Sequence, residues 1–113
     1  MDYKIKSRIW IELNEEEFLG EGKVRLLKAI EKTGSLSKAA KSINISYRRA
    51  WQLLHAVNKS SNQPVTINSV GGKGGGGTEL TPFGKALIKV FDDMNKQCWK
   101  FLDVQLEKIK ALS

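Results

Sequence analysis

The sequence has little of the chemistry from which most catalytic and metal sites are built. Its 113 residues include one cysteine, Cys98, and one histidine, His55. A lone cysteine excludes a disulfide within the chain and a metal site that uses paired thiolates. A lone histidine supports neither a histidine-rich metal site nor, beyond chance, a catalytic triad. We therefore expect no metal, no cofactor and no enzymatic activity, with the reducing cytoplasm as the compartment.

Long apolar stretches are missing as well. Residues 1–13 interleave Lys4, Lys6 and Arg8 with apolar side chains. This pattern fits neither a signal peptide nor a membrane span, and no later segment is apolar over the ~18–20 residues that a span requires. We expect no association with a membrane.

Positive charge, in contrast, is abundant and concentrated in one part of the chain. Lysine and arginine number 19 against 12 acidic residues, which gives a formal net charge of +7. Between Lys23 and Lys59 the only acidic residue is Glu31. Basic charge collected in one segment favours a polyanionic partner over charge that serves solubility alone.

The first half of the chain reads as a strand followed by three helices. Residues 5–13 alternate apolar and polar side chains, which predicts a half-buried strand. A helix is expected from near Glu21 to Gly34, and a short helix after the capping residue Ser35. After a brief turn, Ser46 caps a third helix over residues 47–58.

The second half reads as a hairpin followed by a long helix. Residues 63–80 predict two short strands joined by a glycine-rich tip. Thr81 and Pro82 are a strong helix start, and no glycine or proline interrupts residues 85–113. This order predicts a mainly α fold with a small β component, a winged helix-turn-helix of order β-α-α-α-β-β-α. We expect one compact unit in two parts, a DNA-binding part over residues 1–81 and a long dimerisation helix over residues 82–113.

The third helix is the expected reading element for double-stranded DNA. A helical projection turns Ala50, Leu54 and Val57 inward and leaves a polar side outward. Arginine can bind guanine and glutamine can bind adenine through paired hydrogen bonds in the major groove. An ordinary solvated helix face is the alternative, and Trp51, at the edge between the two sides, is expected to pack. The predicted base-reading residues are Arg48, Arg49, Gln52 and His55.

Other polar residues are placed to meet the DNA backbone, which fixes register without reading sequence. The predicted backbone contacts are Ser37, Lys38, Lys41, Ser46, Tyr47, Lys59 and Lys73. The glycine run 71–77 matches a dinucleotide-binding pattern in part, but Gly74 follows Lys73 where a phosphate-binding loop needs serine or threonine. We therefore interpret the run as the tip of a hairpin.

The long last helix is too long and too apolar to be covered by so small a core, which predicts a homodimer. Two copies would place two third helices about 34 Å apart, on successive major grooves. The alternative is a protein-interaction module whose basic face docks on an acidic partner. The predicted dimerisation residues are Ile9, Ile11, Leu87, Val90, Phe91, Met94, Phe101 and Leu102.

Three segments carry a resemblance to a known family: residues 34–40, residues 45–51, and the glycine run 71–77 that leads into residues 80–84. Together they resemble the N-terminal DNA-binding domain of ModE-type molybdate-responsive transcription regulators, which are related to LysR-type domains. The resemblance implies a bacterial or archaeal transcription factor that dimerises through its first strand and long last helix. Family members that sense molybdate carry a separate C-terminal domain for it. Because the sequence ends at Ser113, directly after the long helix, we do not expect this chain itself to bind molybdate.

Overall fold

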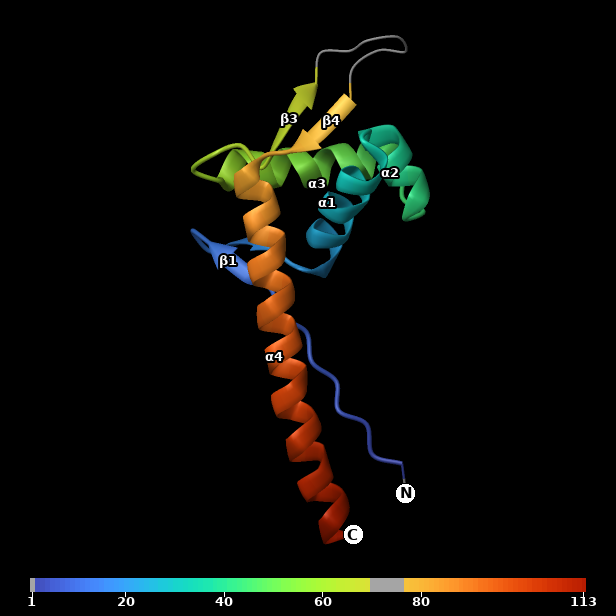
Figure 1. The fold of residues 1–113 in the computed structure, drawn as a ribbon, viewed down its shortest axis with the longest axis vertical. Helices are drawn as coiled ribbons and strands as arrows, with labels where there is room; N and C mark the ends of the chain where they lie inside the picture. Colours follow the sequence, from blue (N-terminus) through green and yellow to red (C-terminus); the bar gives the residue numbers. More distant parts are fainter. Residues whose placement is uncertain (1, 70–76) are drawn as a thin grey trace.

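The computed structural model describes residues 2–69 and 77–113, and it has the mainly α winged helix-turn-helix architecture that the sequence predicts (Figure 1). Helices α1 to α3 pack together, the β3–β4 hairpin lies over α3, and α4 extends away from this body. The elements are β1 (Ile11–Leu13), β2 (Glu16–Leu19), α1 (Glu21–Thr33), α2 (Leu36–Ser42), α3 (Tyr47–Ser60), β3 (Thr66–Ser69), β4 (Gly77–Leu80) and α4 (Pro82–Leu112).

The predicted caps set the limits of the first three helices. Gly34 ends α1 in the left-handed conformation, with φ of 75°, and its N–H donates to the carbonyl of Ile30. The Ser35 hydroxyl accepts from the N–H of Lys38 at the start of α2. The Ser46 hydroxyl accepts from the N–H of Arg49 at the start of α3. Each cap satisfies backbone groups that have no partner inside the helix.

The β3–β4 hairpin is fixed to the helices at its base. Its strands pair antiparallel from Thr66 opposite Leu80 to Ser69 opposite Gly77. The Asn58 side chain, on α3, accepts from the N–H of Val65 at 2.8 Å and donates to the Thr66 hydroxyl at 3.0 Å. The predicted tip, with Lys73, lies outside the described residues. These hydrogen bonds thus fix the position of the hairpin base relative to α3.

The N-terminal strand is shorter than predicted, and its partner was not foreseen. Only Ile11–Leu13 forms a strand, and it pairs with β2, Glu16–Leu19, to which the sequence reading assigned no strand. Asn14 and Glu15 link the two with positive φ angles of 54° and 69°, as in a tight two-residue hairpin turn. Residues 5–10 have the alternation of a strand, but no strand among residues 2–69 and 77–113 pairs with them. A period-two pattern marks extended backbone, whereas a strand also requires a hydrogen-bonded partner.

One apolar core lies between the helices and the base of the hairpin. Its centre is α1, which buries Leu26, Leu27 and Ile30 almost completely. Helix α4 adds apolar side chains to this core only near its start, with Ile88 and Phe91 as its buried large residues. The helix then continues for about another 20 residues without a buried side chain.

The molecule is therefore long and narrow, with principal extents of 61 × 29 × 22 Å. The N-terminal segment runs beside the far part of α4, so both ends of the chain lie at the same end of the molecule (Figure 1). Within the described residues, no helix combines the length and the apolar character that crossing a membrane would require.

Candidate nucleic-acid interface

Helix α3 presents one buried side and one polar, exposed side. Ala50 and Val57 are 0% and 1% exposed, and Leu54 is half-buried against the core. Arg48 and Gln52 are exposed on the opposite side. The predicted orientation of the helix is thus confirmed. All four predicted base-reading residues, which are Arg48, Arg49, Gln52 and His55, are exposed, and base reading itself stays a prediction.

One flank of α3 faces the β3–β4 hairpin and carries aromatic side chains. The rings of Trp51 and His55 stack at 4.8 Å between centroids with an angle of 7° between planes. Trp51 is half exposed, so its expected packing amounts to the stack on His55 and not to burial in the core. A groove of about 250 Å³ separates this pair and Tyr47 from Asn68 and Thr78 of the hairpin.

Most of the residues predicted to contact the DNA backbone lie on α2 and at the two ends of α3. Ser37, Lys38 and Lys41 are exposed on α2, and Lys59 is exposed near the end of α3. The Ser46 hydroxyl already caps α3. Tyr47 is 57% exposed at the first position of α3. A second groove, of about 360 Å³, runs between Ser35, Ser37, Tyr47 and the hairpin residues Asn68 and Thr78.

The other flank of α3 is lined by arginines that come from three different parts of the chain. Arg49 shares a pocket of about 250 Å³ with Arg8 of the N-terminal segment and Arg25 of α1. Sequence reasoning did not select Arg8 or Arg25. The only signal in the sequence is the rarity of arginine. The chain has four arginines, and three of them line this pocket. Their proximity depends on how the N-terminal segment and α1 pack against α3, which no local pattern shows.

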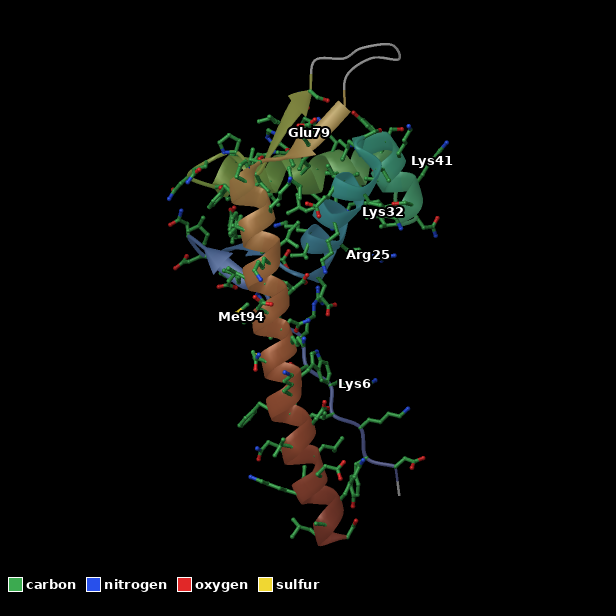
Figure 2. The ribbon with its side chains drawn as sticks, viewed as in Figure 1. Lys6, Arg25, Lys32, Lys41, Glu79 and Met94 are labelled. Atoms are coloured by element: carbon green, nitrogen blue, oxygen red, sulfur yellow. The ribbon has the colours of Figure 1, made fainter. Side chains whose placement is uncertain are left out.

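Most basic side chains near α3 have no acidic partner among the described residues. The ion pairs among the described residues are Lys23–Glu17, Lys28–Asp92, Lys89–Asp93 and Lys110–Glu107, and the last two lie within α4. Figure 2 shows Arg25, Lys32 and Lys41 along one edge of the body formed by α1 and α2. Helices α1 to α3 carry nine basic residues against two acidic ones, whereas α4 carries six against four, so this body is the part of the molecule that attracts a polyanion most strongly.

The predicted dimerisation residues divide into three groups by their exposure. Phe91 is 3% exposed and belongs to the core of the single chain, so it offers no free surface, which corrects its assignment to an interface. Val90 and Phe101 are 63% and 64% exposed. The others, which are half-buried, are Ile9, Ile11, Leu87, Met94 and Leu102.

An apolar groove brings together three of these residues, Ile9, Phe101 and Leu102. It has a volume of about 370 Å³ and lies between Ser7 and Ile9 on one side and Cys98, Phe101 and Leu102 of α4 on the other. Three further exposed apolar residues on α4 escaped the sequence reading, namely Val104, Ile109 and Leu112. Their spacing extends the apolar pattern of α4 toward the end of the helix.

Residues 2–69 and 77–113 contain no group of three or more histidine, cysteine or acidic side chains that could hold a metal ion.

Comparisons with known proteins match this chain to one group of regulators. No family model matches it. The transcriptional regulator ModE of Haemophilus influenzae is 43% identical over 82 residues, which are 73% of this chain and 32% of that protein. The DNA-binding transcriptional dual regulator ModE of Escherichia coli K12 is 36% identical over 94 residues, 83% of this chain and 36% of that protein. The molybdenum transport protein ModE of Azotobacter vinelandii is 29% identical over 107 residues, 95% of this chain and 40% of that protein.

The chain thus spans about a third of the length of these relatives, while the matches cover most of its own length. The helix-turn-helix, the hairpin and the long last helix of the structure are the elements that the resemblance implies. The resemblance carried by residues 34–40, 45–51 and 71–77 with 80–84 is confirmed, because most of the chain is similar to part of the ModE-type regulators, as expected of an N-terminal domain of that type.

Proposed function

We propose that this protein is a sequence-specific, double-stranded DNA-binding regulator of transcription that acts as a homodimer. The observation that carries the proposal is the exposed side of α3, where Arg48, Gln52 and His55 lie opposite the buried Ala50 and Val57. An α-helix fits the major groove, and these side chain types can bind base edges there. Relatives named transcriptional regulators support the same role. A non-catalytic protein of this kind acts on chromosomal DNA, so we infer a cytoplasmic location.

The two parts of the chain take different roles in this proposal. Residues 1–81 bind DNA, with α3 in the major groove and Ser37, Lys38 and Lys41 of α2 on the phosphates. Residues 82–113 hold two copies together through the apolar side of α4. Val90 and Phe101 support this, because large apolar side chains that are more than half exposed on a helix are typical of an uncovered interface.

Arg48→Ala tests the base-reading role of α3. DNA ligands selected from random sequence by the wild-type protein supply a specific site, and a scrambled duplex supplies the non-specific reference. We expect Arg48→Ala to weaken binding by about 1–3 kcal/mol per half-site, which is about 5- to 150-fold for each, and to relax base preference at one position in each half-site of the selected site.

Lys96→Ala is the matched control, because Lys96 is an exposed basic residue on α4, away from α3. Its affinity for the selected site should equal that of the wild type. Equal affinity of Arg48→Ala and wild type for that site would contradict the proposal and would favour a protein-docking role for the basic face.

A further inference from the structure

The geometry of the major groove assigns a DNA strand to each flank of α3. The groove is about 12 Å wide, and a helix with its side chains is about 10–12 Å across. A helix lying in the groove therefore has one phosphate backbone on either side of it. On α3, one flank is formed by Tyr47 and Trp51 beside the hairpin. The other flank is formed by Arg49 and Leu53.

The flank away from the hairpin opens into a strongly basic pocket, which we call the arginine pocket and define by Arg8, Arg25 and Arg49. Lys23 is the fourth basic residue in its lining and Glu17 is the only acidic one. Glu17 is already engaged, with its carboxylate 3.6 Å from the ammonium group of Lys23. Within the described parts of the chain the three arginines form no ion pair, so the pocket has an excess of positive charge.

The lining of the arginine pocket is partly apolar, which strengthens the field of these charges. Ile43, Ile45 and Leu53 line it. Apolar walls lower the local dielectric constant, so an anion in the pocket interacts more strongly with the guanidinium groups than it would on an open surface. The planar guanidinium group also offers paired donors that match phosphate oxygens.

We propose that the arginine pocket binds a backbone phosphate of the DNA strand that lies on the side of α3 away from the hairpin. This inference rests on the proposed function and extends it to two residues, Arg8 and Arg25, that lie outside the helix-turn-helix. It also makes Arg49 a phosphate contact instead of a base reader. The Trp10 ring, 5.9 Å from the Arg8 guanidinium carbon, helps to place Arg8.

The test measures the salt dependence of binding to the selected site and to the scrambled duplex for wild type, Arg25→Ala, Arg8→Ala and the control Lys96→Ala. Losing one phosphate contact decreases the steepness of log K against log salt by about 0.9, so a homodimer that loses one contact in each copy shows a decrease of about 1.8. We expect this decrease in both pocket variants, together with a loss of affinity of about tenfold that is equal for the two duplexes. Lys96→Ala should keep the wild-type slope, and all proteins should keep the wild-type unfolding midpoint.

Each other outcome contradicts the inference in a distinct way. An unchanged slope in both pocket variants, with normal DNA binding by the wild type, would overturn the pocket and leave the proposed function standing. A loss confined to the selected site would assign Arg25 to base reading. Inorganic phosphate that raises the unfolding midpoint through Arg25, without any effect of Arg25→Ala on DNA binding, would assign the pocket to a free anion. A wild-type protein that binds neither duplex would overturn both proposals.

Discussion

At the scale of single residues, glycine determines how closely the helices and the hairpin approach each other. A Cβ atom on Gly77 would lie 2.5 Å from the carbonyl oxygen of Gly34, which accepts the N–H of Thr78. A Cβ atom on Gly84, in the first turn of α4, would overlap the carbonyl oxygen of Val65. That carbonyl accepts the N–H of Thr81 at 3.0 Å. These approaches set where the hairpin and α4 sit relative to α1 and α3.

Gly84→Ala should therefore destabilise the protein. We expect the free energy of unfolding to fall by about 1–3 kcal/mol, because the added methyl group forces the start of α4 away from the hairpin. Gly22→Ala is the matched control, since nothing lies within 4 Å of the corresponding position in α1. It should raise stability by up to about 1 kcal/mol through helix propensity. Urea unfolding monitored by circular dichroism gives both values, and equal stability of the two variants would contradict the packing described.

The positions of single residues could be predicted best where they depend only on a local sequence pattern. The solvent-facing orientation of Arg48 and Gln52 followed from helical periodicity, since it depends only on which side of α3 is apolar. The half-exposed Trp51 was harder to place, because a position at the edge of the apolar side can pack or face solvent, and the His55 stack decides it. Arg8 and Arg25 could not be assigned, because their contact with Arg49 joins segments far apart in sequence.

At the scale of elements, the helices were predictable because each has a chemical start or stop. Gly34, Ser35, Ser46 and Thr81 mark the ends that the structure has. The β1–β2 hairpin was missed, since Glu16 and Glu17 suggest a solvated loop and only the pairing with Glu12 and Leu13 makes this segment a strand. Charged side chains on a short edge strand are common, but they give no apolar alternation to read.

Helix α4 is the element that we propose forms the dimer interface. Val90, Met94 and Phe101 share one side of it, while Lys96 lies on the opposite side of the helical projection. Phe101→Glu should convert the dimer to a monomer at micromolar concentration, because a carboxylate would have to be buried without a partner. Lys96→Glu should leave the dimer intact.

Sedimentation equilibrium of both variants and the wild type measures this effect. The proposed interface would be wrong if the wild type sedimented as a monomer, or if Phe101→Glu and Lys96→Glu dissociated equally. Far-ultraviolet circular dichroism provides the folding control, since Phe101 lies outside the core of the single chain and its substitution should leave helix content in the body unchanged.

At the scale of the whole molecule, the basic body and the extended part of α4 lie at opposite ends of the long axis. The body of α1 to α3 carries most of the excess positive charge, while α4 extends to one end of a molecule 61 Å long. This arrangement allows one end to bind DNA while the other supports dimerisation. Two bodies held by their α4 helices would present two α3 helices to one side of a duplex, at a spacing of about one helical turn.

Protection of guanine N7 from dimethyl sulfate tests most directly whether α3 binds in the major groove, because N7 is accessible only there. On a selected site, saturating wild-type protein should protect guanines in two patches about 10 base pairs apart. Arg48→Ala, at saturating concentration, should leave one guanine in each patch open to methylation while the remaining guanines stay protected. Saturated binding without protection of any guanine would show that α3 does not enter the major groove.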